Sequence, residues 1–218
     1  MKVALLAGPE RIVIEDAPEP KPAAGEVVLR TELAGICGTD VSFYLGHRTA
    51  PFPFVLGHEV IGRVAAVGAG AGRFETGQRV LVEPNYPCGT CALCLSGRGA
   101  VCARKQSPGV NLPGCFAEYF RAPEEFVWPV PDAVPDSDAV TIEPLAVSVH
   151  GFARSGARSG DTVAVLGCGV VGLLLIHAAA AAGVRVLAHD RVPLKREMAR
   201  SFGAETPPED ADAAQLWQ

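Results

Sequence analysis

A glycine-rich turn between two apolar segments restricts the possible folds of this chain most. Residues 162–166 form a continuous apolar run, and residues 170–182 form an apolar segment of helical length that ends before Gly183. The turn between them has the spacing G-x-G-x-x-G, in the order Gly167, Gly169, Val170, Val171 and Gly172. After a strand and before a helix, these glycines permit a tight turn, close approach of a pyrophosphate and close helix–strand packing. The pattern predicts the start of a dinucleotide-binding α/β unit.

The second strand pattern of this region, residues 184–188, is followed by Asp190, and a helix is expected over residues 193–203. A carboxylate at this place accepts hydrogen bonds from the ribose hydroxyls of adenosine and repels a ribose phosphate, which favours NAD over NADP. Three basic residues lie close by: Arg191, Lys195 and Arg196. One of these cations could bind the ribose phosphate of NADP or stack on adenine. Alternatively, the basic residues only form a solvated surface.

The first part of the chain has a different sequence pattern, in which short segments typical of β-strands are separated by turn residues. These segments are residues 3–6, 12–15, 27–33, 60–67, 79–82, 116–120 and 126–130. This spacing predicts a small β barrel or sandwich. Near residue 136 the pattern changes again, because Asp136 or Ser137 is expected to cap a helix that carries Glu143. Pro144 is expected either to bend that helix or to mark a second helix start.

Composition narrows the class of protein. The chain has 218 residues with 49% hydrophobic and 20% charged residues, which indicates an ordered globular protein. A net charge of −5 argues against nucleic acid as a partner, because nucleic-acid-binding proteins usually carry a basic surface. The N-terminus is too soon broken by Gly8-Pro9 for a signal peptide, and no apolar run reaches membrane-spanning length. Seven cysteines without an export signal favour metal over disulfide chemistry and predict a cytoplasmic protein.

Four of the cysteines form one dense cluster with the spacing C-x2-C-x2-C-x7-C. They are Cys88, Cys91, Cys94 and Cys102. Two-residue gaps let thiolates converge on one ion, and four sulfurs without an open position are typical of structural zinc. Two disulfides or an iron–sulfur cluster are the alternatives. The remaining Cys115 and Cys168 are expected to be unreactive thiols.

A second candidate metal site centres on Gly57-His58-Glu59, between an apolar run and a strand pattern. A lone histidine is more often a structural residue than a ligand. Cys37 upstream and Glu143 downstream support a ligand role, and the hypothesis is that these residues hold one catalytic metal.

These motifs occur together in the order of a known family. The chain resembles the zinc-containing medium-chain alcohol dehydrogenases, and most closely their polyol (sorbitol-type) and threonine dehydrogenase branch. The resemblance covers about residues 1–204. It rests on the Gly57–Ala71 signature, the Cys37–Asp40 motif, the four-cysteine cluster, the Glu143–Ala146 motif and the glycine loop. It implies a mixed fold. Residues 1–145 would form a GroES-like β-barrel catalytic domain with a structural-zinc lobe at 84–103, and residues 146–218 a partial α/β Rossmann domain.

The resemblance also implies site roles by position. Cys37 and His58 would be ligands of the catalytic zinc, and Glu143 stands where many members have a further cysteine ligand. Glu59 would be a direct ligand or an exchanging neighbour of the metal. Thr39 would pass on the alcohol proton, while zinc favours the alkoxide and nicotinamide accepts the hydride.

Two departures from the family are visible. Many relatives have a histidine of the proton relay where this chain has Ser42, and His47 lies further on. A complete Rossmann domain has two βαβαβ halves, whereas this chain contains little more than strand–helix–strand–helix, so Gln218 is expected to be a truncation point. Part of the substrate pocket is expected to be lined by Tyr44, Leu45, Phe52 and Phe116.

The leading hypothesis is an NAD-dependent zinc dehydrogenase that oxidises a secondary alcohol of a polyol, sugar or hydroxy amino acid. The alternative is a catalytically silent, zinc-stabilised fragment or one half of a split enzyme. A zinc-free quinone reductase relative is disfavoured, because it would not need Cys37, His58 and four clustered cysteines together. The expected partners are a small-molecule alcohol and, for a full-length relative, further copies of the chain, with neither nucleic acid nor membrane.

Overall fold

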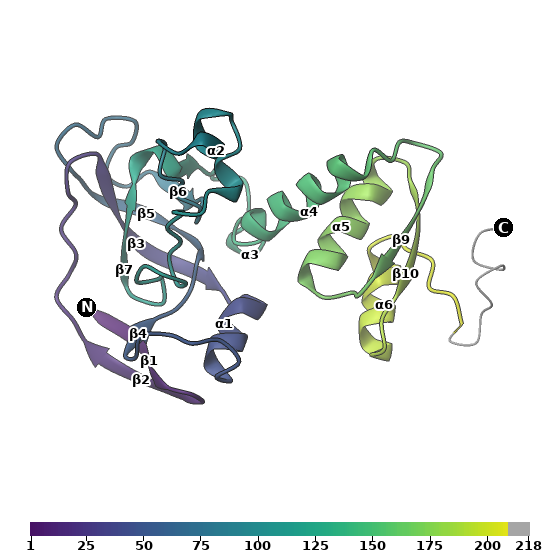
Figure 1. The fold of residues 1–218 in the computed structure, drawn as a ribbon, viewed down its shortest axis with the longest axis horizontal. Coiled ribbons are helices and arrows are strands. Elements are labelled where there is room, and N and C mark those ends of the chain that lie inside the picture. Colours follow the sequence, from purple (N-terminus) through teal and green to yellow (C-terminus); the bar gives the residue numbers. More distant parts are fainter. Residues whose placement is uncertain (209–218) are drawn as a thin grey trace. The chain divides into compact units, whose positions relative to one another are not determined.

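The computed structural model describes residues 1–208 and divides the chain into two compact units (Figure 1). The first unit runs from Met1 to Thr141, and the second begins at Ile142. The sequence predicts a domain boundary after residue 145, and this boundary stays a prediction. Helix α4 (Ile142–Ser155) packs on helix α5 (Val170–Ala181) of the second unit. The predicted truncation point at Gln218 lies outside the described residues.

The first unit is built from two antiparallel sheets. The smaller sheet has the order β2-β1-β4, with β1 Lys2–Gly8, β2 Arg11–Asp16 and β4 Phe54–Val55. The larger sheet has the order β7-β3-β5-β6-β8, with β3 Glu26–Gly35, β5 Glu59–Val67, β6 Arg79–Val82, β7 Tyr119–Pro123 and β8 Val127–Pro129. The side chains of Val27, Leu29, Val64, Val80 and Val127 are buried in its core. The predicted small β domain is confirmed.

Two predicted strands start later than the sequence indicated. The segment before β7 is diverted to the smaller sheet, where the N–H of Ala4 donates to the carbonyl of Phe116 at 2.8 Å. The N–H of Glu118 likewise donates to the carbonyl of Lys2 at 3.1 Å. Residues 124–126 form a 3₁₀ turn, η2 (Glu124–Phe126), before β8. Apolar alternation alone does not reveal which sheet a segment joins.

Short helices fill the connections of the first unit. They are α1 (Gly38–Tyr44), α2 (Ala92–Leu95), the 3₁₀ turn η1 (Gly99–Val101) and α3 (Asp136–Ala139). The helix expected from Asp136 or Ser137 through Glu143 is therefore two helices, since α3 ends before α4 begins. Pro144 lies in the first turn of α4 and marks the second start, where its missing N–H is harmless.

The second unit has the predicted strand–helix–strand–helix order. Strand β9 (Thr162–Leu166) pairs in parallel with β10 (Arg185–His189), and α5 and α6 (Pro193–Ser201) follow the two strands. Ile176 and Ala179 of α5 are fully buried in a core with Val186 and Ala199. Gly183 has a φ of +76°, which fits its predicted place after the helix end.

Candidate functional site

Cys37 lies in the turn where strand β3 ends and helix α1 begins. It is the N-cap residue of α1, and the carboxylate of Asp40 accepts a hydrogen bond from its backbone N–H at 2.9 Å. This capping arrangement fixes the direction of the Cys37 backbone. Thr39 lies in the first turn of the same helix, and hydrogen bonding from its backbone and side chain contributes to lowering the pKa of the Cys37 thiol.

Asp40 also holds the segment that carries His58. Its side chain is buried, with 2% of the residue exposed, and its Oδ1 accepts from the backbone N–H of Gly57 at 3.0 Å. The same oxygen lies 3.8 Å from Nδ1 of His58. One buried carboxylate therefore joins two loops that are distant in sequence. This role was not predicted from the sequence, although an acidic residue three positions after Cys37 is a recognisable N-terminal capping signal.

Gly57 gives the loop before β5 a shape that other residues would strain. Its φ is +94°, and an added Cβ would lie 2.4 Å from the Phe116 ring and 2.9 Å from Sγ of Cys115. Only glycine combines this backbone conformation with this close approach. The loop therefore places His58 directly before β5 and Glu59 as the first residue of that strand.

Cys37, His58 and Glu59 converge on one point. One ligand atom from each of them lies within 4.8 Å of the other two. Zinc bonds to such ligands are about 2.0–2.3 Å long, so only small side-chain adjustments separate this group from a shared ion. The donor set of thiolate, imidazole and carboxylate suits zinc. The residues therefore fit a catalytic zinc ion, and the structure brings together three of the four predicted ligands.

The electrostatics of this cluster also suit a cation. A hydrogen bond from His58 lowers the pKa of the Cys37 thiol against the opposing effect of burial. Burial raises the pKa of Glu59, since its carboxylate lies in a site without bulk water. A bound divalent ion would reverse that preference by stabilising the ionised carboxylate.

Glu143, the fourth predicted ligand, belongs to the other unit. It lies in the first turn of α4, next to Pro144. Its ligand role stays a prediction, as does the proton-relay role of Thr39. The residues expected to line the substrate pocket differ in exposure: Leu45 and Phe52 are exposed by 41% each, while Tyr44 and Phe116 are half-buried.

The four clustered cysteines form a second candidate metal site. Their sulfur atoms are separated by 3.9 Å (Cys88–Cys94), 3.5 Å (Cys88–Cys102), 3.4 Å (Cys91–Cys94) and 3.8 Å (Cys91–Cys102). Four sulfurs around one zinc at about 2.3 Å would lie about 3.8 Å apart. None of the cysteines forms a disulfide, which removes the disulfide alternative for this structure. The geometry fits a closed tetrahedral zinc site.

Backbone donors favour thiolates in part of this cluster. The N–H of Thr90 lowers the pKa of Cys88 to about 5, and the N–H of Cys94 lowers the pKa of Cys91. Burial has the opposite effect on the two cysteines that belong to neither metal cluster, where it raises the pKa of Cys115 and Cys168. A raised pKa disfavours the reactive thiolate, which supports the prediction that these two thiols are unreactive.

The glycine loop of the second unit has the geometry expected for a phosphate cradle. Gly167 has a φ of +99°, and an added Cβ at Gly172 would lie 2.0 Å from the Gly167 carbonyl oxygen. Gly169 caps helix α5, and an added Cβ there would meet nothing within 4 Å. The loop therefore leaves open space at a helix N-terminus, where backbone N–H groups attract phosphate.

Asp190 follows strand β10, and its side chain binds the backbone of the glycine loop. Its carboxylate accepts from the backbone N–H groups of Val192 and Cys168, both at 2.9 Å. These two bonds lower the pKa of Asp190, which keeps it ionised. The hydrogen bond to Cys168 is a structural role of Asp190 that was not predicted from the sequence.

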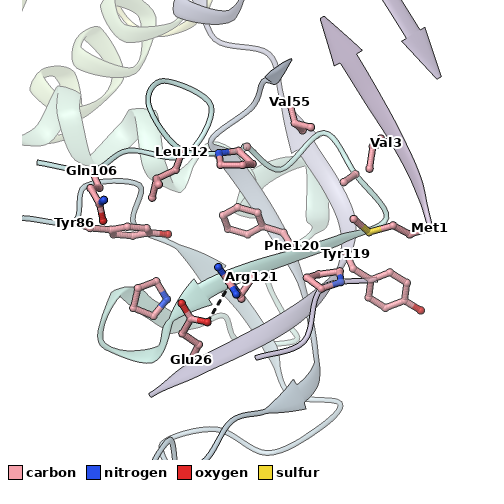
Figure 2. A pocket seen from close by; sticks show the side chains of 15 residues that line it. Met1, Val3, Glu26, Val55, Tyr86, Gln106, Leu112, Tyr119, Phe120 and Arg121 are labelled. Atoms are coloured by element: carbon pink, nitrogen blue, oxygen red, sulfur yellow. Dashed lines mark ion pairs between the residues drawn. The ribbon is translucent and has the colours of Figure 1, made fainter. Parts of the chain in front are cut away.

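A pocket of about 490 Å³ lies elsewhere in the first unit (Figure 2). Tyr86 and Phe120 line it together with an ion pair between Glu26 and Arg121, whose closest atoms are 3.1 Å apart. Its lining contains no member of either metal cluster. The pocket therefore supplies none of the chemistry described above.

Comparison with known proteins identifies the family. The model of the alcohol dehydrogenase GroES-like domain matches residues 23–132, which is half of the chain. The chain belongs to the zinc-containing medium-chain alcohol dehydrogenases. The match confirms the predicted GroES-like domain, and the glycine loop agrees with the partial Rossmann domain of this family.

Individual relatives of the family support the same assignment. A sorbitol dehydrogenase of Bacillus subtilis (strain 168) is 37% identical over 94% of this chain and 60% of its own length. An L-threonine 3-dehydrogenase of Mesorhizobium japonicum is 37% identical over 89% of this chain and 58% of its own length. The solved short chain alcohol dehydrogenase of Escherichia coli CFT073, complexed with NADH, is 35% identical with a TM-score of 0.89, over 96% of this chain and 63% of its own.

The chain thus spans about three fifths of the length of the relatives it matches. The family has solved members with NADH and with NADP. Among the residues that the structure describes, none of the helices combines the length and the apolar character needed to cross a bilayer.

Proposed function

We propose that the protein is a zinc-dependent dehydrogenase that oxidises a secondary alcohol of a polyol, sugar or hydroxy amino acid with NAD. The convergence of Cys37, His58 and Glu59 within 4.8 Å carries this proposal, because three mixed donors leave room for a substrate oxygen. The names of the sorbitol and threonine dehydrogenase relatives support the substrate class.

The catalytic zinc would be held by Cys37 and His58, with Glu59 and Glu143 as the carboxylate candidates. When bound, zinc supplies positive charge that favours loss of the alcohol proton. Thr39 lies two residues after Cys37 in the first turn of α1, and its hydroxyl can accept and pass on this proton. Asp40 orients the two ligand-bearing loops through its bonds to Cys37 and Gly57.

Cofactor binding would fall to the glycine loop and Asp190. The N-terminus of α5 and the open space at Gly169 suit a pyrophosphate. The lowered pKa of Asp190 keeps a negative charge at the ribose, which favours NAD. Arg191 and Lys195 remain candidate contacts for the adenosine end. The bound dinucleotide supplies the hydride acceptor.

The four-cysteine cluster would hold a structural zinc, because its sulfurs leave no position for a substrate. Thiolate ligands of this kind persist in a reducing compartment, so we propose a cytoplasmic location. A homo-oligomer is proposed for the whole protein.

Metal analysis and a substrate panel test this function together. We expect two zinc ions per chain in freshly purified protein, and NAD reduction with at least one polyol, sugar or hydroxy amino acid when the dehydrogenase is complete. Protein without zinc would contradict the proposal. Two zinc ions without activity in the 218-residue chain would instead favour the alternative, a zinc-stabilised piece that needs further residues for catalysis.

A further inference from the structure

Two residues of the candidate metal site face each other across neighbouring strands. Gly35, the last residue of β3, is the direct partner of Glu59, the first residue of β5, in the antiparallel register. Cys37 and His58 each lie within two residues of this pair. The Gly35–Glu59 pair therefore lies at the point where both ligand-bearing segments leave the sheet.

The Glu59 side chain occupies the place that a side chain at position 35 would take. A Cβ added to Gly35 would lie 2.1 Å from Oε2 of Glu59, 3.1 Å from its Cβ and 3.2 Å from its Cδ. All three nearest atoms thus belong to one side chain. Carbon atoms of real side chains essentially never approach other heavy atoms closer than 3.0 Å, so the carboxylate would have to move.

The backbone does not explain the glycine. Gly35 is absent from the glycines with positive φ, so an alanine could adopt its conformation. Gly38 lies three residues further on and provides a contrast, because an added Cβ there meets nothing within 4 Å. Space for the Glu59 carboxylate is therefore the specific requirement at position 35.

We propose that Gly35 is a positioning residue of the metal site. Its missing side chain creates the niche that holds the Glu59 carboxylate beside Cys37 and His58. This inference rests on the proposed zinc-dependent function and adds a residue that acts on the metal through Glu59.

The niche also limits where a displaced carboxylate can go. Glu59 is buried, with 8% of the residue exposed, at the start of β5 directly opposite Gly35 of β3. A methyl group at position 35 leaves the backbone pairing intact and removes only the volume that the carboxylate fills. Gly35→Ala should consequently shift the carboxylate away from Cys37 and His58 and weaken metal binding, by no more than removal of the carboxylate itself.

Zinc affinity in four variants tests this inference. We would strip the chain of metal, titrate zinc against a chromophoric chelator, and use the four-cysteine site as the internal reference. Gly35→Ala and Glu59→Ala should each weaken zinc binding at the Cys37 site by a factor of about 10 to 100. The double variant should be no weaker than Glu59→Ala alone. Gly38→Ala should bind like the wild type.

A spectroscopic measurement separates positioning from general damage. With cobalt in the Cys37 site, Gly35→Ala and Glu59→Ala should shift the ligand-field absorption in the same direction, whereas Gly38→Ala should not. If Gly35→Ala fails to fold, recovery of folding in the double variant supports the inference and continued misfolding overturns it.

The outcomes distinguish this inference from the proposed function. The positioning role alone would be overturned if the wild-type chain binds two zinc ions and Glu59→Ala, but not Gly35→Ala, weakens zinc binding at the Cys37 site. Multiplicative losses in the double variant would do the same. A wild-type chain that takes up only one zinc ion would overturn both.

Discussion

The two metal clusters of this protein are assembled in different ways. The four cysteines lie within fifteen consecutive residues, 88–102, and a short loop is enough to bring their sulfurs together. Cys37 and His58 are separated by a strand, a helix and two loops, and they meet because β3 pairs with β5 and Asp40 joins their loops. A contiguous site depends on its own ion, whereas an assembled site depends on the surrounding fold.

The largest effect is expected from breaking the contiguous cluster. Structural zinc contributes about 10–16 kcal/mol of apparent binding free energy in small zinc peptides. Cys91→Ser should release one zinc ion per chain and lower the melting temperature by about 10 °C or more. Metal analysis and thermal unfolding would measure both. Cys168→Ala, a buried thiol outside the clusters, should keep both ions. Retention of two ions in Cys91→Ser would contradict the closed four-sulfur site.

The assembled site should respond to Asp40, which is not a predicted ligand. Asp40→Ala leaves the part-buried N–H of Cys37 and the buried N–H of Gly57 without their acceptor, at about 1–3 kcal/mol each. We expect a loss of about 2–5 kcal/mol in the free energy of unfolding by urea, with zinc lost from the Cys37 site only. Asp16→Ala removes an exposed ion pair and should cost about 0–1 kcal/mol. Equal losses in both variants would show that Asp40 does not join the loops.

The glycine loop is contiguous like the cysteine cluster, but two of its glycines should behave differently. An alanine at Gly172 would place its Cβ 2.0 Å from a backbone oxygen, so Gly172→Ala should destabilise the chain by about 1–3 kcal/mol. Gly169→Ala meets open space and should change stability by about 0.5 kcal/mol or less.

NADH titration completes this comparison. Gly169→Ala should weaken NADH binding about tenfold, since the methyl group occupies the cradle at the helix N-terminus. Unchanged affinity in Gly169→Ala would exclude the cradle as the phosphate site. A destabilised Gly169→Ala would show that the open space has a structural use.

The contrast between contiguous sites and sites assembled from distant segments also explains which features could be predicted from the sequence. The four-cysteine cluster and the local geometry of Gly167 and Gly172 could be predicted from spacing, because they depend on residues close together in the sequence. The displaced start of β7 could not be predicted, since Phe116 bonds to a strand more than a hundred residues earlier. The roles of Asp40 and Gly35 depend on which strands pair, and a single sequence does not contain that register.

The smallest effect is expected from Asp190, which closes the contiguous glycine loop from a neighbouring strand. The N–H groups of Val192 and Cys168 lower its pKa in the folded chain below the ordinary value of 3.8. A group with a lowered folded pKa contributes stability that is present above pH 3.8 and is lost as the pH falls through the folded pKa. The free energy of unfolding by urea should therefore fall less steeply below about pH 4 in Asp190→Asn than in the wild type. Asp132→Asn, an exposed carboxylate, should leave that pH dependence unchanged. An identical pH dependence in Asp190→Asn and the wild type would mean that the loop needs no tertiary contact to hold its shape.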